Sequence, residues 1–155
     1  MGTATTSASQ AGASIEEKRG RFAEHIARHG LKTTRQRNCV ADVFFAQDEH
    51  LTIEEMLELV RKQDPKIGYA TVYRTLKLLT EAGLAAERKF ADGVARYEQA
   101  LGQKHHDHMV CTECGEVIEF VSDKIEELQD SIAARHGFKL KSHKLELYGI
   151  CKNCQ

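Results

Sequence analysis

Two cysteine pairs place the strongest constraint on how this chain can fold. Cys111 and Cys114 are separated by two residues, and Cys151 and Cys154 near the end of the sequence have the same spacing. Each Cys-x-x-Cys turn directs two thiolates toward a common point about 2.3 Å from each sulfur, and two such turns complete a tetrahedral shell. We therefore predict a closed, structural zinc site that ties the end of the chain to the segment around the first pair.

A redox-active dithiol or a disulfide is the alternative use of these cysteines. The first 14 residues are small and polar, which predicts a disordered tail rather than an export signal. The sequence has no apolar run of about 18 residues, the length needed to cross a membrane. We therefore expect a cytoplasmic protein, in a reducing environment where paired cysteines favour metal. Cys39 falls on an apolar helical stripe and is predicted to be a core residue.

A run of histidines directly before the first cysteine pair predicts further metal sites. His105, His106, Asp107 and His108 are consecutive, and Glu119 follows on the next predicted strand. Side chains of a strand alternate between its two faces, so His106 and His108 should point one way while His105 and Asp107 point the other. Imidazole and carboxylate ligands suit Fe, Mn, Co, Ni or Zn, and one short segment can therefore supply two different sites.

The first half of the sequence predicts several short helices. Helical spacing of apolar residues extends from Glu16 to about His29, and Thr34 is the expected N-cap of a second helix. The sequence Thr52-Ile53-Glu54-Glu55 is a capping box that begins a third helix, which ends before Asp64-Pro65. A hairpin is expected around Asp92-Gly93, because alternating segments flank this turn pair.

A fourth helix is predicted between Gly68 and Gly83, with Val72, Leu76 and Leu79 facing the core. Its outer face carries hydroxyl and cationic side chains, namely Thr71, Tyr73, Arg74 and Lys77. Helices followed by a two-stranded ribbon are typical of a winged helix-turn-helix, and such an outer face suits a DNA major groove. An ordinary solvated helix face is the alternative interpretation.

The second half predicts a small α/β domain. The expected elements are strands at 105–110 and 117–121, a helix at 122–136 and an extended segment at 138–150. Ile125, Leu128 and Ile132 are expected to face inward from the helix. Residues 1–90 carry 14 Lys and Arg against 12 Asp and Glu, whereas residues 91–155 carry 8 against 11. Together with the elements, this asymmetry favours two modules.

The predicted fold class is therefore α+β, with an N-terminal winged helix-turn-helix domain followed by a small α/β domain that carries a four-cysteine zinc site. We expect the tail to span 1–14, the winged helix 15–97 and the metal-binding domain 98–155. No nucleophile or Gly-rich phosphate loop is evident, so a metalloenzyme is a poor fit. A metal-storage or delivery protein is the other alternative, although it would not need the exposed face of the fourth helix.

The sequence closely resembles the ferric uptake regulator family over about residues 16–154. The most specific element is HHDHMVCTECGEVIEF, joined by GLKTTRQR, YATVYRTLKLL and the terminal HKLELYGICKNC. The resemblance implies a homodimeric transcription factor that has a C-terminal dimerisation domain, senses a divalent metal and binds palindromic, A·T-rich double-stranded DNA when loaded.

The resemblance also assigns residues to sites. The regulatory metal site would use ligands from several parts of the chain, namely His50, Glu98, His106, His108 and Glu119. A second site within the dimerisation domain would use His105, Asp107, Glu126 and His143. Besides the outer face of the fourth helix, the DNA contacts would include Lys32, which resembles a lysine that enters the narrow minor groove.

Glu98 and Glu119 resemble the iron-responsive branch of the family. The resemblance thus implies a repressor of iron uptake and metal homeostasis genes, with structural Zn²⁺ and regulatory Fe²⁺. Peroxide-, zinc- or manganese-responsive regulators of the same family remain alternatives. Nitrogen and oxygen ligands also bind Mn²⁺, Co²⁺ and Zn²⁺, and the Irving–Williams order places Fe²⁺ among the weaker of these ions.

Overall fold

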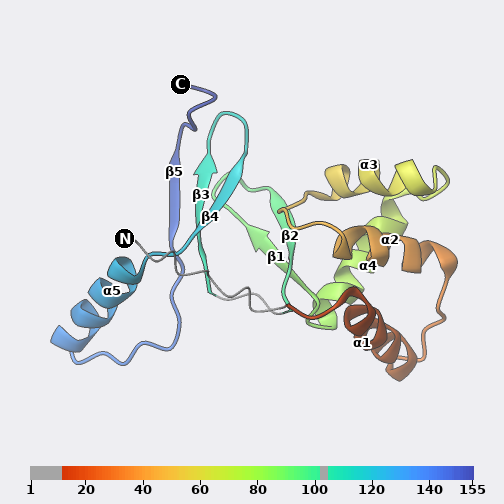
Figure 1. Ribbon diagram of the computed structural model, residues 1–155, viewed down its shortest axis with the longest axis horizontal. Coiled ribbons are helices and arrows are strands. Elements are labelled where there is room, and N and C mark those ends of the chain that lie inside the picture. The colour runs from red at the N-terminus through yellow and green to blue at the C-terminus, as the bar shows by residue number, and fades with distance from the viewer. Residues whose placement is uncertain (1–11, 102–104) are drawn as a thin grey trace, which may run out of the picture. The chain divides into compact units, whose positions relative to one another are not determined.

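The computed structural model describes residues 12–101 and 105–155, and most of the predicted tail lies outside these residues. The chain divides into two compact units, residues 1–103 and 104–155. Four helices and a hairpin make up the described part of the first unit, and a three-stranded sheet with one helix makes up the second (Figure 1). None of the described helices combines the length and the apolar character needed to cross a membrane.

The helices of the first unit are α1 (Ile15–Arg28), α2 (Arg35–Phe45), α3 (Ile53–Gln63) and α4 (Tyr69–Glu81). The predicted N-caps are confirmed, because the hydroxyls of Thr34 and Thr52 accept hydrogen bonds from backbone N–H groups in the first turns of α2 and α3. Glu55 completes the capping box by accepting from the backbone of Thr52 at 2.8 Å. Reciprocal caps satisfy donors that helix geometry otherwise leaves unpaired.

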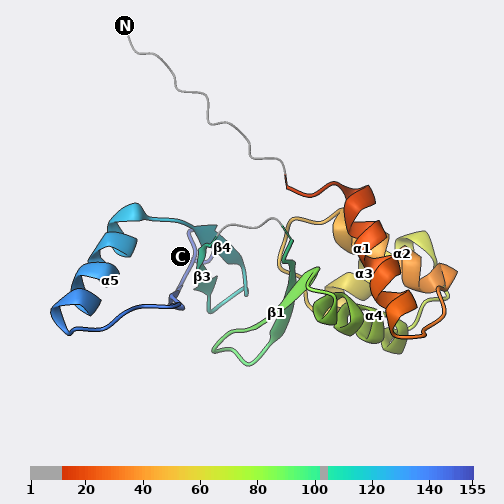
Figure 2. The same cartoon turned by 90° about the horizontal axis from the view of Figure 1, so that it is seen from below.

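One apolar core joins the four helices of the first unit. Val72, Leu76 and Leu79 of α4 are fully buried in it, as their spacing predicts, together with Val40 of α2 and Val60 of α3. Figure 2 shows α1 on the outside of the group and α4 beside the strand β1. Burial of one face of α4 leaves its opposite face exposed.

The wing of the first unit is the antiparallel hairpin β1 (Ala85–Lys89) and β2 (Ala95–Gln99). Gly93 in its turn has φ +78°, a backbone conformation that glycine adopts without strain. Leu51 adds a bridge to Tyr97, so the segment before α3 pairs with the wing. The expected boundary between 97 and 98 falls inside β2, and the first unit extends past it because β2 stays paired with β1 through Gln99.

The second unit is built on β3 (Asp107–Cys111), β4 (Val117–Phe120), β5 (Glu146–Gly149) and α5 (Asp123–Arg135). The strand β3 is central, with β4 antiparallel on one side and β5 parallel on the other. These observations confirm the α+β class and the winged helix-turn-helix order. The extended segment predicted at 138–150 is only partly a strand, since residues 138–145 have no regular structure.

The inward face predicted for α5 is wrong for the single chain. Leu128 is 57% exposed and Ile132 is 43% exposed, and Phe138 just beyond the helix is 69% exposed. Periodicity groups Leu128 and Ile132 on one face of α5, but the described residues leave both side chains largely exposed. Figures 1 and 2 show α5 in the second unit beside the β3–β5 sheet. The described part of the second unit therefore buries few apolar side chains of its own.

Candidate metal sites and nucleic-acid interface

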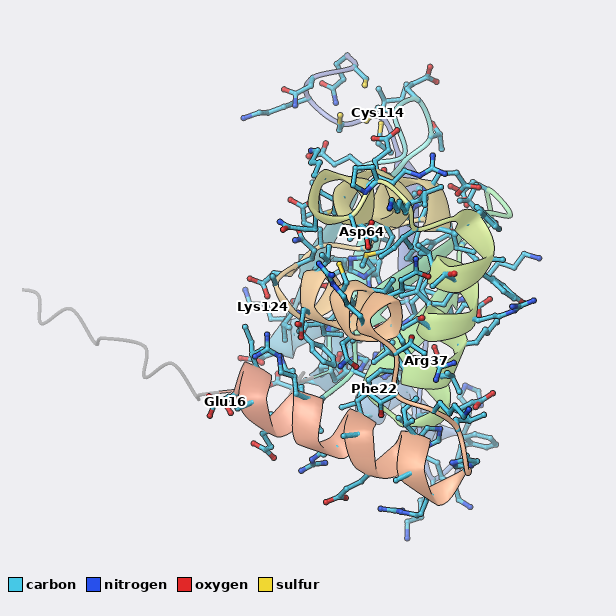
Figure 3. All side chains as sticks on the ribbon, turned by 90° about the vertical axis from the view of Figure 1, so that its right-hand side faces the viewer. Glu16, Phe22, Arg37, Asp64, Cys114 and Lys124 are labelled. Atoms are coloured by element: carbon cyan, nitrogen blue, oxygen red, sulfur yellow. The ribbon has the colours of Figure 1, made fainter. Side chains whose placement is uncertain are left out.

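The four paired cysteines gather at one end of the β3–β5 sheet. Cys111 ends β3, Cys114 lies in the turn before β4, and Cys151 and Cys154 follow β5. The four Sγ atoms all lie within 4.8 Å of one another, and those of Cys114 and Cys151 are 3.8 Å apart. Figure 3 shows Cys114 among the sulfur atoms at this end of the unit. The structure thus brings the two cysteine pairs together, as the predicted zinc site requires.

Backbone geometry prepares these thiols for a cation. The N–H groups of Cys151 and Cys114 donate hydrogen bonds to Cys111 and lower its pKa to about 6. Hydrogen bonds from the thiol of Cys154 to Cys151 and Cys114 raise the pKa of Cys154 to about 12. Near neutral pH such a cluster stabilises one thiolate and keeps another protonated, and a bound cation would favour ionisation of all four thiols. All five cysteines are free thiols, so the residues present fit a four-sulfur zinc site.

A second group of side chains that can bind a metal lies elsewhere in the second unit, around the start of β3. His105 lies two residues before β3, Asp107 begins β3, Glu126 comes from α5, and His143 from the segment before β5. The Nε2 atoms of the two histidines lie 3.3 and 3.4 Å from Oδ1 of Asp107, and 3.5 and 3.3 Å from Oε1 of Glu126. One donor atom of each residue lies within 4.8 Å of all the others.

The surroundings of Asp107 also favour a cation. Asp107 is 1% exposed, and neither of its carboxylate oxygens has a hydrogen-bond partner among the described residues. Glu126 Oε1 and His143 Nε2 are likewise buried without such a partner. Buried carboxylates are costly unless they are paired or bind a metal. Two imidazoles and two carboxylates around one point therefore fit a divalent ion.

The other two histidines, His106 directly before β3 and His108 within it, lie near Glu119. His106 Nε2 lies 3.5 Å from Oε1 of Glu119, and the rings of His106 and His108 are 4.8 Å apart. His108 pairs with Glu119 across the β3–β4 hairpin, so strand register brings the carboxylate to these histidines. The HHDH run thus divides between two groups of ligands, as predicted, although β3 begins at Asp107 and not at the expected residue 105.

The first unit also carries two residues that can ligate a metal, His50 and Glu98. His50 Nε2 lies 2.5 Å from Oε2 of Glu98, and Arg88 Nε lies 2.7 Å from Oε1 of the same carboxylate. The segment before α3 supplies His50, and the wing supplies both Glu98 and Arg88. The two carboxylate oxygens are therefore divided between an imidazole and a guanidinium.

The outer face of α4 is available to a nucleic acid. Tyr73 is 42% exposed, Arg74 is exposed, and Thr71 and Lys77 are partly exposed. Lys32 is exposed in the segment between α1 and α2, where its carbonyl accepts a hydrogen bond from Arg37. Arg37 therefore has a structural role in this segment, which orders the backbone that carries Lys32.

Sequence reasoning missed two side chains at these sites. Arg88 lies diagonal to Glu98 across the wing, and Glu87 lies directly opposite Tyr97. Glu87 also pairs with Lys77, one of the expected DNA contacts. The charged residues of β1 are visible in the sequence, but only strand register and the packing of α4 against β1 show which partner each charge meets.

Comparison with known proteins assigns the chain to a family. Residues 28–148 match the Ferric uptake regulator family. The ferric uptake regulation protein of Campylobacter jejuni is 41% identical over 136 residues, which cover 86% of each chain.

Solved structures of related regulators share the fold. The ferric uptake regulator of Helicobacter pylori, whose structure reveals three functional metal binding sites, has a TM-score of 0.84 and 32% identity over 92% of this chain and 94% of that one. The Vibrio cholerae regulator, whose structure reveals a rearrangement of DNA-binding domains, has a TM-score of 0.69 and 39% identity over 83% and 98%. The family match, the sequence identity and the shared fold lead to one conclusion: the chain belongs to the ferric uptake regulator family.

Proposed function

We propose that this protein is a divalent-metal-dependent DNA-binding repressor that responds to iron and controls genes of iron uptake and metal homeostasis. The observation that supports this most directly is the combination, in one chain, of a winged helix with ligand groups of two different chemistries. Four thiols suit a permanent zinc ion, whereas imidazole and carboxylate groups suit an exchangeable ion. Such a chain regulates rather than catalyses.

The four cysteines would hold zinc in a closed shell with no position for substrate. Their role is to fix the chain end beside the β3–β4 hairpin, which supports the small second unit. Because that unit buries little apolar surface by itself, a structural metal contributes directly to its folding free energy. His105, Asp107, Glu126 and His143 would hold a further ion that joins α5 to β3.

The regulatory ion would be held by ligands from both units, His50 and Glu98 from the first and His106, His108 and Glu119 from the second. Coordination would restrict how the winged helices are oriented. Shifting such an equilibrium from 1:99 to 99:1 needs about 5.5 kcal/mol of differential binding. Several coordinate bonds supply free energy on this scale, whereas an exposed ion pair contributes at most about 1 kcal/mol.

A homodimer would place two winged helices on one palindromic DNA. The exposed apolar face of α5, together with Phe138, is the surface that a second copy would cover. In dimeric helix-turn-helix proteins the two recognition helices enter half-sites about 34–36 Å apart. Thr71, Tyr73, Arg74 and Lys77 of each copy would contact the major groove, and Lys32 would contact the A·T-rich minor groove.

A metal titration tests the regulatory function. Fe²⁺ under anaerobic conditions, or Mn²⁺, is added to chelated full-length protein in the presence of an A·T-rich palindromic duplex, and binding is followed by fluorescence anisotropy. Affinity should rise at least about tenfold on loading, because metal stabilises the DNA-competent orientation. DNA affinity that does not depend on metal would contradict the switch while leaving the DNA-binding fold intact.

Two matched variants separate the structural and regulatory sites. Cys111→Ser should release zinc and destabilise the second unit, since three thiolates form an incomplete shell. His106→Ala should keep the zinc and the fold but lose the metal response of DNA binding. Elemental analysis and thermal unfolding distinguish these outcomes. If both variants merely unfold, the division into structural and regulatory sites is wrong.

A further inference from the structure

An ion pair connects α4, the helix proposed to enter the major groove, to the wing. Lys77, on the exposed face of α4, pairs with Glu87 on β1. The ammonium nitrogen of Lys77 also lies 5.6 Å from the centre of the Tyr73 ring, one turn earlier on the same helix. Figure 2 shows α4 and β1 beside each other. A cation expected to contact DNA is therefore already held by a carboxylate and an aromatic ring.

The side chain of Tyr97 holds the carboxylate of Glu87 in place. The hydroxyl of Tyr97 donates a hydrogen bond to Oε2 of Glu87 at 3.1 Å. Tyr97 is only 1% exposed, and it is the direct partner of Glu87 across the hairpin. Because a buried side chain anchors the carboxylate to the wing, Glu87 is not free to follow Lys77 toward a different partner.

The pair is electrically neutral as a unit. The hydrogen bond with Lys77 lowers the pKa of Glu87, and the same hydrogen bond raises the pKa of Lys77. Both groups are therefore charged near neutral pH, and their charges cancel. If Lys77 moved to a phosphate, the anchored carboxylate would be left without this cation beside the negatively charged DNA backbone.

We propose that Glu87 is a specificity-determining residue, which cancels the charge of Lys77 and holds the lysine beside Tyr73 instead of on a DNA phosphate. Phosphate contacts attract DNA of any sequence, whereas contacts to base edges distinguish sequences. With Lys77 held by Glu87, binding by α4 depends more on base-edge contacts, and the remaining N–H donors of Lys77 reach acceptors from one fixed position. This role presupposes the DNA-binding function proposed above.

Salt dependence of DNA binding distinguishes this role from a simple brace between α4 and the wing. Each phosphate that a protein neutralises makes the slope of log K against log [salt] more negative by about 0.9. Glu87→Gln keeps a hydrogen-bond acceptor for Tyr97 but releases the charge of Lys77. The slope should therefore steepen by about 0.9 per chain, or about 1.8 per dimer, on a random-sequence duplex. A brace predicts no such change.

The experiment measures anisotropy of metal-loaded, full-length protein over a range of KCl concentrations. Two probes of equal length are used, an A·T-rich palindromic duplex and a random-sequence duplex. Glu87→Gln should bind the random duplex more tightly and lower the affinity ratio between the two probes. Glu58→Gln on α3 removes the same charge from an exposed residue that forms no ion pair with Lys77 among the described residues, and it should change the slope much less.

The double variant Lys77→Gln/Glu87→Gln tests the same idea without a free lysine. It replaces a neutral pair by another neutral pair, so its slope should equal that of the wild type. If the slope of the double variant is instead less negative than that of the wild type by about 0.9 per chain, Lys77 neutralises a phosphate in the native complex. This result would overturn the inference.

The remaining outcomes are distinguishable. An unchanged slope in Glu87→Gln, or an equal change in Glu58→Gln, overturns the role of Glu87 while the wild type still binds the palindrome in a metal-dependent way. Wild-type protein that binds neither duplex overturns the proposed DNA-binding function, and the role of Glu87 with it.

Discussion

Asp107 shows how the surroundings of one residue indicate a bound cation. Its carboxylate is almost fully buried and has no hydrogen-bond partner among the described residues, while two imidazole nitrogens lie 3.3 and 3.4 Å from one of its oxygens. Leaving a buried polar group unsatisfied costs about 1–3 kcal/mol, and more if it is charged. The position is therefore unfavourable without a cation and favourable with one.

Asp107→Asn should consequently have opposite effects on the chelated and metal-loaded protein. The amide keeps the side-chain volume but carries no charge, so chelated protein should be at least as stable as the wild type. Metal-loaded protein should gain less stability, because one anionic ligand is missing. Urea unfolding with and without Mn²⁺ measures both differences. Equal stabilisation of wild type and variant by the metal would contradict a site at Asp107.

At the scale of elements, the wing depends on the turn that joins its strands. Asp92 accepts a hydrogen bond from the backbone N–H of Val94 at 3.0 Å and another from Arg96 at 2.9 Å. The hydrogen bond from Arg96 holds the pKa of Asp92 below its ordinary value of 3.8. The ionised carboxylate therefore helps to fix the register that places Glu87 and Glu98 on the wing.

Asp92→Ala should reduce stability by about 1 kcal/mol at pH 7, a value discounted for the solvent exposure of the pair. Since the folded pKa is depressed, the contribution of Asp92 is complete above about pH 4 and is lost as the pH falls through the folded pKa. The difference between wild type and variant should therefore shrink in urea unfolding as the pH falls below about 4. A difference that grows on acidification would show that the ionised form is not what stabilises the turn.

At the scale of the whole molecule, the face of α5 leads to the expectation of a second chain. Leu128 and Ile132 have the spacing of a buried helical stripe, yet they and Phe138 beyond the helix are between 43% and 69% exposed. Soluble monomers seldom expose large contiguous apolar patches. An isologous contact between two copies would cover this face and give the assembly the two-fold symmetry of a palindromic operator.

Leu128→Glu should therefore weaken self-association, because it places a charge in the surface that the second copy would bury. Ala134→Glu is a matched control, since Ala134 is exposed on the other side of α5. Sedimentation over a range of protein concentrations should show a monomer for the first variant and a dimer for the second. The interface would lie elsewhere if Leu128→Glu remained dimeric.

The sequence by itself determined the features that depend on local spacing. Thr52 and Glu55 cap α3 because the four residues of the box are enough to pair the free N–H groups, and the buried face of α4 follows from a repeat of 3.6 residues. The cysteine pairs indicated a metal shell because each turn orients two sulfurs without help from the rest of the chain.

Only the tertiary structure decided which distant groups meet. Strand register places Glu87 opposite Tyr97 and Arg88 diagonal to Glu98. Packing of α4 and of the segment before α3 against the wing brings Lys77 to Glu87 and His50 to Glu98. The tertiary structure also showed that the described residues leave the apolar face of α5 exposed, although periodicity had identified that face. Local spacing fixes which side of an element is apolar or charged, but the partner of that side depends on packing between segments far apart in the sequence.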